Sequence, residues 1–203
     1  MEANQTETVQ YTFTAANPGT YLYHSGTSPV LQVEMGLVGA IIVRPTMGPN
    51  YAYNHIDSRF DMEYLFLLSE MDPRIHQAVE FYGPDTVDPE WYSDYFPGWW
   101  FINGRNAPDT MLMEDDSWLP TQPYNCMPVT HPGEKLLMRV ISAGRDLHPF
   151  HHHGNHARVI ARDGRLLDTG TGDSMIDLSY MEFTIQAVPG ETTDAILDWT
   201  SKG

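Results

Sequence analysis

Five of the nine histidines lie within residues 148–156, and their spacing is suited to binding a metal ion. Imidazole nitrogens are common ligands of zinc, copper, iron and nickel. Side chains two residues apart on a β-strand point to the same face, so His151 and His153 can converge on one ion if this stretch is extended. Pro149 cannot donate a hydrogen bond to a neighbouring strand, which predicts that the strand begins at or after it and that His148 points in a separate direction. The pattern predicts a metal site, and the alternative is a histidine-rich surface patch that binds metal only adventitiously.

The other residues of metal-binding type give weaker patterns. His152 has the wrong strand parity to share an ion with the histidines on either side of it. The single cysteine, Cys126, excludes an intramolecular disulfide and has no histidine beside it in a usable pattern, so we expect a structural or free thiol. Three isolated histidines are expected to be ordinary surface or hydrogen-bonded residues: His55, His76 and His131.

Short segments of alternating or apolar residues predict a chain made mostly of strands. Asn103-Gly104 and Asp163-Gly164 predict tight hairpin turns, because these dipeptides accept positive φ. Asp72 before Pro73 predicts the start of one short helix. With no long amphipathic helix and no internal repeat recognised, we expect an all-β protein, most simply a sandwich of antiparallel sheets. The segments interpreted as strands are 8–14, 21–24, 40–43, 64–68, 100–102, 135–142, 159–161, 181–187 and 194–200.

The composition indicates a folded, acidic protein. The chain of 203 residues has 11 Lys and Arg against 27 Asp and Glu, which gives a formal net charge of −16 and a pI near 4.7. Hydrophobic residues make up 41%, enough for the core of one large or two small domains. The acidity argues against a nucleic acid partner, which Lys and Arg clusters would have to bind, and favours cations. No stretch reaches the roughly 20 apolar residues of a transmembrane segment, and the polar start lacks the pattern of a secretory signal peptide.

Two stretches resemble one protein family. Residues 148–154, His-Pro-Phe-His-His-His-Gly, resemble the His-Pro-x-His-x-His-Gly motif of the multicopper oxidases, which are built from cupredoxin β-sandwich domains. Residues 18–26 and 32–45 are similar to the end of a first cupredoxin domain in that family, and the two motifs occur in the family's order. The resemblance implies a cupredoxin-like Greek-key β-sandwich, with the end of one domain followed by most of a second. The boundaries expected are 1–45 for the last strands of the first domain, 46–60 for a linker and 61–203 for the second domain, which carries the histidine motif.

The resemblance also implies copper as the cofactor and assigns roles to particular residues. His148 would bind the type 1 copper, which accepts electrons, and His151 and His153 would bind the trinuclear cluster where dioxygen is reduced. His24 would be a weaker fourth metal ligand, and the motif gives no role to His156. The implied activity is one-electron oxidation of a small-molecule reductant coupled to reduction of dioxygen to water. Relatives of this kind are usually exported to the periplasm or outside the cell, and some complete their copper sites between domains or subunits, so the resemblance also implies a homo-oligomer.

The sequence departs from the family pattern at several ligand positions. Gly26 stands where the second histidine of a His-Ser-His motif is expected, and the His-Cys-His motif that provides the type 1 thiolate is not found. Ser25 stands where the related copper nitrite reductases have their type 1 cysteine. We therefore expect a fragment of a longer oxidase, or a branch that lost copper positions, and expect the chain alone to be inactive. The alternatives are a non-catalytic cupredoxin-type module that binds one metal ion or none and serves in interaction, or a mononuclear metal enzyme.

Overall fold

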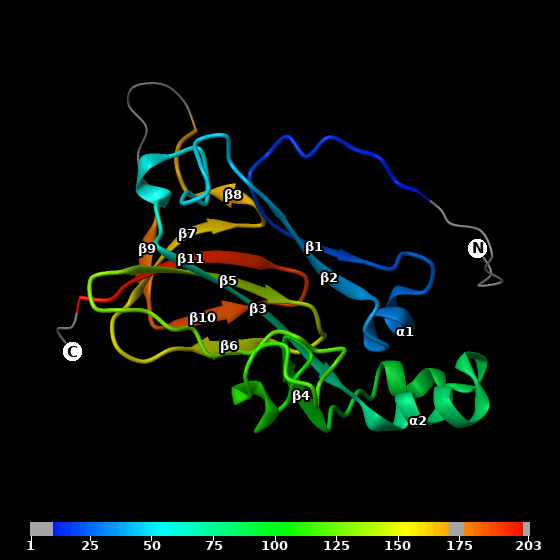
Figure 1. Cartoon of the computed structure of the whole chain (residues 1–203). Coiled ribbons are helices and arrows are strands. Elements are labelled where there is room, and N and C mark those ends of the chain that lie inside the picture. Colours follow the sequence, from blue (N-terminus) through cyan, green and yellow to red (C-terminus); the bar gives the residue numbers. More distant parts are fainter. Residues whose placement is uncertain (1–9, 171–176, 201–203) are drawn as a thin grey trace.

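The computed structural model describes residues 10–170 and 177–200, and strands dominate this part of the chain (Figure 1). The two α-helices found there are α1 (Pro29–Glu34) and α2 (Pro73–Tyr82). Short 3₁₀ turns occur at Ile56–Ser58, Pro84–Thr86, Pro89–Tyr92 and Asp109–Met111. Neither α-helix has the length or apolar character that crossing a lipid bilayer requires.

One large sheet and two strand pairs make up the β structure. The large sheet has the strand order β4-β3-β5-β11-β7-β8, and β9 also pairs with β7. Its strands are β3 (Met62–Met71), β4 (Trp99–Ile102), β5 (Lys135–Ser142), β7 (Ala157–Arg162), β8 (Arg165–Leu166), β9 (Tyr180–Glu182) and β11 (Thr192–Asp198). The antiparallel pairs are β1 (Gly19–His24) with β2 (Val38–Val43), and β6 (His148–His151) with β10 (Thr184–Ala187).

The two faces of the large sheet are buried by different parts of the chain. Side chains alternate across a strand, and on β5 Met138 and Val140 belong to the hydrophobic cluster that includes Ile185 of β10. The next residue, Leu137, belongs to a second cluster with Tyr53. The β6–β10 pair therefore covers one face of the sheet and the segment after β2 covers the other.

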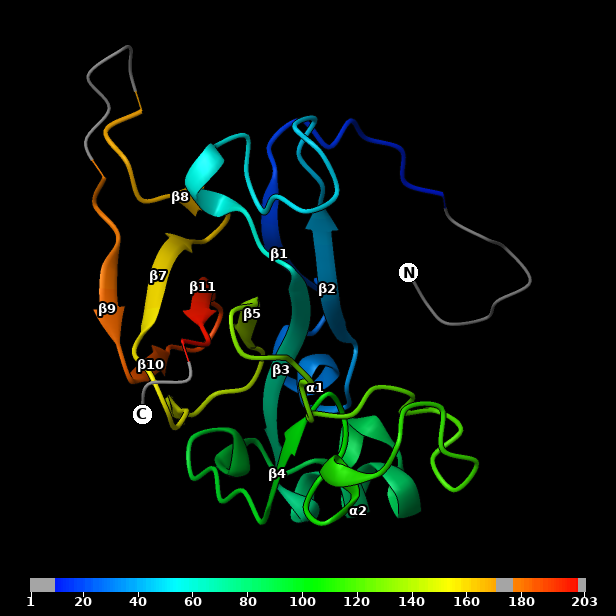
Figure 2. The ribbon, with the colours of Figure 1, turned by 60° about the vertical axis from the view of Figure 1, so that its left-hand side comes forward.

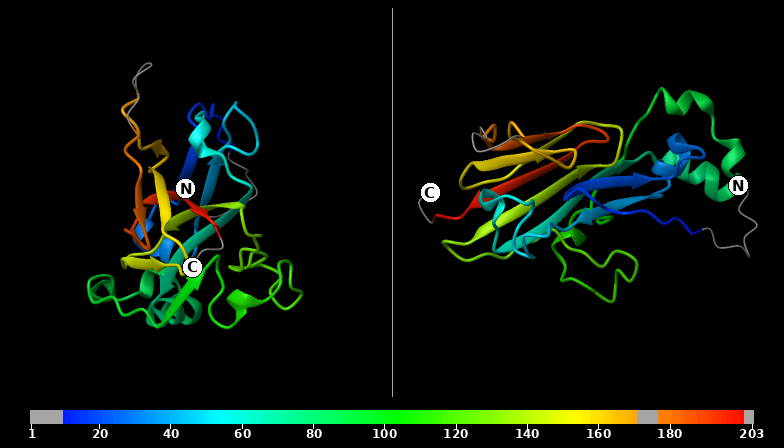
Figure 3. Two further views of the ribbon diagram at one scale, coloured as in Figure 1. Left: turned by 90° about the vertical axis from the view of Figure 1, so that its left-hand side faces the viewer. Right: turned by 90° about the horizontal axis from the view of Figure 1, so that it is seen from above.

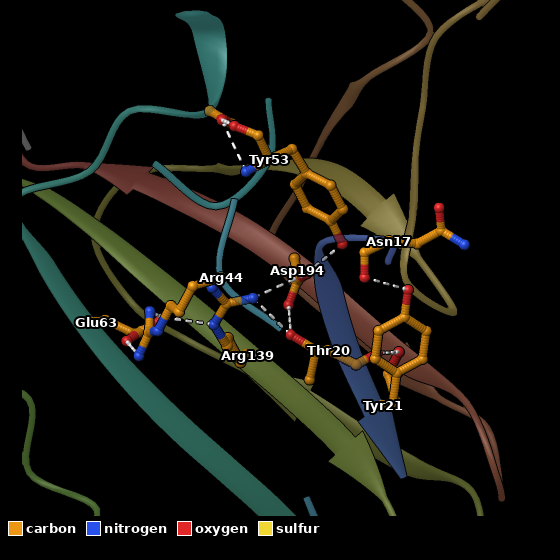
Figure 4. Close-up of polar contacts among 10 residues, drawn as sticks. Asn17, Thr20, Tyr21, Arg44, Tyr53, Glu63, Arg139 and Asp194 are labelled. Atoms are coloured by element: carbon orange, nitrogen blue, oxygen red, sulfur yellow. Dashed lines mark hydrogen bonds and ion pairs between the residues drawn. The ribbon is translucent and has the colours of Figure 1, made fainter. Parts of the chain in front are cut away.

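A buried polar network joins the β1–β2 hairpin to the large sheet (Figure 4). The hydroxyl of Thr20 on β1 donates to Asp194 Oδ1 on β11 at 2.6 Å and accepts from Arg139 Nη1 on β5 at 2.6 Å. The hydroxyl of Tyr53 donates to Asp194 Oδ2 at 2.6 Å. Arg139 also donates from Nε to Glu63 on β3 at 2.5 Å, and Glu63 in turn accepts two hydrogen bonds from Arg44, which follows β2. These contacts fix the hairpin by direction-dependent bonds rather than by apolar packing alone.

The predicted turns, helix start and central strand are confirmed. Residues 135–142 form β5, within the large sheet. Asn103 and Gly104 have φ of 54° and 78°, and Asp163 and Gly164 have φ of 49° and 70°. The Asp72 carboxylate accepts from the backbone N–H of Arg74 at the start of α2.

Other expectations need correction. Residues 10–14 of the predicted strand 8–14 form no strand, since no neighbouring strand covers them, and Tyr11 remains 78% exposed; residues 8 and 9 lie outside the described residues. The predicted strand 181–187 is two strands, β9 and β10, which separate at Phe183 and pair with different neighbours.

The sheets are also not wholly antiparallel. Strands β3 and β5 pair in parallel, with Phe66 opposite Val140. A parallel pair needs a long crossover, which the chain provides in the segment holding α2 and β4. Figures 2 and 3 show α2 and much of this segment gathered at one end of the molecule.

Candidate metal centre

The structure brings His151 and His153 together. His151 is the last residue of β6 and points to the exposed side of the strand, whereas Phe150 before it packs against the hydrophobic core. The rings of the two histidines have centroids 5.0 Å apart and lie at 78° to each other. Nδ1 of His151 is 2.7 Å from the hydroxyl of Thr184 on β10. Two imidazoles in this arrangement can donate to one ion.

His148 lies on the other side of β6, facing inward. Its Nε2 is 2.8 Å from Oε2 of Glu70, a residue near the end of β3 whose side chain is 0% exposed. Glu70 Oε1 accepts from the backbone N–H of Arg145 and, at 2.9 Å, from that of Asp146. Burial alone would raise the pKa of Glu70, but the hydrogen bonds from His148 and from these two backbone groups outweigh it, and the pKa lies below its usual value. Glu70 is therefore a charged, fixed acceptor for His148.

His24 lies apart from these residues. It is the last residue of β1, is exposed, and its Nδ1 lies 2.8 Å from the backbone oxygen of Ser25. Strand β1 pairs with β2, and neither strand pairs with β6. Within residues 10–170 and 177–200, no three His, Cys, Asp or Glu side chains gather as a metal site.

His152 is the histidine in the motif that sequence reasoning set aside. Both of its ring nitrogens are buried without a hydrogen-bond partner among the described residues, and the ring packs near Phe183, with centroids 5.9 Å apart. Burial lowers the pKa of His152, and the neighbouring His151, His153 and His156 lower it further. His156 also contacts Phe183, with centroids 3.9 Å apart. Phe183, where β9 and β10 separate, thus contacts three histidines of this stretch, His151, His152 and His156.

The donor set fits copper in part. His151 and His153 supply two imidazoles, the ligand type that suits copper, on an exposed surface. No thiolate joins them, because Cys126 lies against the hydrophobic core and its Sγ is 3.4 Å from the backbone oxygen of Thr110. The residues thus suit part of a copper site, which further donors would have to complete.

Glu70 is the contact of this region that the sequence did not reveal. It lies 78 residues from His148 in the chain and forms no short motif with it. The two residues meet because β3 pairs with β5 in parallel, which brings the end of β3 next to the segment leading into β6. Predicting this contact from the sequence would have required predicting that β3 and β5 pair in parallel.

The comparisons with known proteins concern the fold of the chain. Residues 2–48 match the family model described as multicopper oxidase. The blue copper oxidase from Nitrosomonas europaea has a similar structure, with a TM-score of 0.68 and 22% identity, covering 98% of this chain and 53% of that one. The multicopper oxidase mgLAC gives a TM-score of 0.62 and 21% identity, covering 90% of this chain and 46% of that one. The copper-containing nitrite reductase from Thermus scotoductus gives a TM-score of 0.57 and 18% identity, covering 93% of this chain and 36% of that one. A search of curated protein sequences found no match.

The resemblance to the multicopper oxidases is therefore confirmed. The chain is a mostly β protein with a cupredoxin-like fold similar to that of these enzymes. It spans about half the length of the first two structures, 53% and 46%.

Proposed function

We propose that this chain works as part of a multicopper-oxidase-like, copper-binding oxidoreductase in which His151 and His153 supply two copper ligands. The observation that carries the proposal is the convergence of these two rings, 5.0 Å apart, on the exposed side of β6. The family motif over residues 148–154 and the cupredoxin-like fold support it. By the family resemblance, His148 would hold the copper that supplies one-electron oxidation of a small-molecule reductant, and His151 and His153 would help hold the copper that supplies reduction of dioxygen, which needs four electrons and four protons to give two waters.

The chain's own residues would orient and complete this site. The hydroxyl of Thr184 contacts Nδ1 of His151, and where it accepts a hydrogen bond from Nδ1–H, the Nε2 lone pair would be left for the metal. His148, on the inner side of β6, would bind a separate ion, and His24 would be a further ligand, as the family motifs imply. The remaining donors would come from a second copy of the chain or from further polypeptide. The proposed boundaries remain 1–45, 46–60 and 61–203, although the segment 46–60 is packed into the core through Ala52, Tyr53 and Phe60.

A second candidate function is a non-catalytic cupredoxin-type module that binds metal or a protein partner. Gly26, which cannot bind a metal through its side chain, and the core-packed thiol of Cys126 favour it. Such a module would keep the cupredoxin-like fold but would not transfer electrons to dioxygen.

Dioxygen uptake separates the two functions. The copper-loaded protein is given a one-electron reductant, a phenol or Fe²⁺, and dioxygen consumption is recorded for this chain and for any longer polypeptide that contains it. We expect uptake of one dioxygen for four electrons where the ligand set is complete, and its loss in the His151→Ala/His153→Ala variant. The variant His131→Ala, which alters an exposed histidine outside the motif, should keep the activity. Bound copper without dioxygen uptake in either form would overturn the oxidase proposal and favour the module.

Export to the periplasm or outside the cell is proposed from the family resemblance. Fractionation of cells that express the complete gene tests it. Protein confined to the cytoplasmic fraction would contradict it.

A further inference from the structure

The carboxylate of Glu70 is held in one position by its surroundings. The side chain is 0% exposed, and its two oxygens have different partners. Oε1 accepts from the backbone N–H groups of Arg145 and Asp146, and Oε2 faces Nε2 of His148. The absence of a side chain at Gly144 makes room, since a Cβ there would overlap the carboxylate. The carboxylate therefore cannot turn without giving up backbone hydrogen bonds.

An ionised carboxylate accepts hydrogen bonds and donates none. A neutral imidazole has one N–H and one nitrogen lone pair. His148 can bond to Glu70 only if Nε2 carries the proton, which places the lone pair on Nδ1. A metal ion binds the lone pair, so the partner of one nitrogen decides which nitrogen the metal can use.

We propose that Glu70 is a positioning residue that fixes His148 as the Nε2–H tautomer and so makes Nδ1 the nitrogen offered to a metal ion. The tautomer follows from the contact of Nε2 with an ionised carboxylate, and the metal-binding part rests on the proposed function. The partner of His151 is different in kind, because the hydroxyl of Thr184 can donate or accept. The structure therefore fixes the tautomer of His148 more firmly than that of His151.

The variant Glu70→Gln tests this inference, because it replaces one carboxylate oxygen with an NH₂ group and keeps the shape of the side chain. The amide oxygen should stay with the two backbone N–H groups, which leaves the NH₂ group facing His148 Nε2. Two donors would then oppose each other, so the ring should move its proton to Nδ1. We expect ¹⁵N NMR of the metal-free protein at about pH 9, where an ordinary imidazole is neutral, to give Nε2–H for His148 in the parent and Nδ1–H in the variant.

A titration with Zn²⁺ alone, followed at each histidine by the same NMR signals, tests the metal-binding part. We expect Zn²⁺ to shift the Nδ1 signal of His148 in the parent, with roughly tenfold or more weaker binding there in Glu70→Gln, the range typical of lost ligand-orienting partners. Glu34→Gln is the matched control: Glu34 is also buried and accepts from the backbone N–H of Asp72 and the hydroxyl of Tyr95, and it contacts none of the proposed ligands. It should change neither result.

A parent His148 with its proton on Nδ1 would overturn the inference, and this needs no variant to fold. An unchanged tautomer and unchanged Zn²⁺ response of His148 in Glu70→Gln would also overturn it. Failure of the proposed function is seen elsewhere, as no metal response of His151 and His153 in the parent, whatever the tautomer of His148.

Discussion

Alternation along β6 divides the histidine motif between two environments. His148 faces a buried carboxylate on the inner side, and His151 faces solvent and a hydroxyl on the outer side. Because the side chains of a strand point alternately to its two faces, the first and second histidines of the motif lie on opposite faces of β6, and we therefore propose separate sites for them. His153 lies beyond the end of the strand, and its ring still approaches that of His151.

The contact between Thr184 and His151 gives a prediction at the same scale. Thr184→Val keeps the shape of the side chain and removes the hydroxyl 2.7 Å from Nδ1, so the ring loses the group that orients it. We expect copper affinity at the His151/His153 pair to fall about tenfold, the lower end of the range for lost orienting partners. Competition with a chromophoric copper chelator measures it. Thr46→Val, which removes an exposed hydroxyl bonded to Asn54, is the control, and equal affinities for all three proteins would refute the role of Thr184.

At the scale of elements, the β1–β2 hairpin depends on buried polar contacts. Thr20 is 0% exposed and both accepts from Arg139 and donates to Asp194. Thr20→Val would leave these buried groups without a partner on β1, at a cost of about 1–3 kcal/mol in the free energy of unfolding. Urea unfolding of the parent and the variant measures the difference. A loss below about 0.5 kcal/mol would contradict a stabilising role for the Thr20 hydroxyl.

The ion pairs of Glu63 predict how stability depends on pH. Burial acts to raise the pKa of Glu63, but its hydrogen bonds and ion pairs with Arg44 and Arg139 outweigh burial and hold the pKa below the usual value. An acid with a lowered folded-state pKa stabilises the fold above its unfolded pKa, about 4.3, and this contribution is lost as the pH falls through the folded-state pKa. We expect the free energy of unfolding to drop more steeply below about pH 4 in the parent than in Glu63→Gln. Urea unfolding across that range measures both slopes, and parallel curves would argue against the prediction.

Local signals explain which elements the sequence could reveal. The Asn103-Gly104 and Asp163-Gly164 turns follow from the positive φ that these dipeptides accept, and residues 135–142 have the composition of a buried strand. The parallel pairing of β3 with β5 has no such local signal, because it depends on how a long crossover folds back. The strand expected at residues 8–14 is absent over residues 10–14 for a related reason, since alternation predicts a strand only where a neighbour exists to pair with it.

At the scale of the whole molecule, the site was predictable in part. Strand parity predicted that His151 and His153 could converge, and their rings lie 5.0 Å apart, although β6 ends at His151 and His153 follows it. The contact of His148 with Glu70 needs the register of strands far apart in the sequence, so it was not predictable from a motif. The net charge of −16 suits a protein that binds cations, and it favours the approach of copper ions without specifying where they bind.

The central claim is that the His151/His153 pair binds copper. The most direct measurement is the copper content of the purified, copper-loaded chain by elemental analysis, together with its electron paramagnetic resonance spectrum. The same measurements are made on His151→Ala/His153→Ala and on the control His55→Ala/His131→Ala, which removes two histidines outside the motif. We predict stoichiometric copper with a Cu²⁺ signal showing nitrogen ligands in the parent and the control, and loss of that copper and signal in the first variant. A parent that binds no copper, or a first variant that retains the parent's copper, would contradict the account.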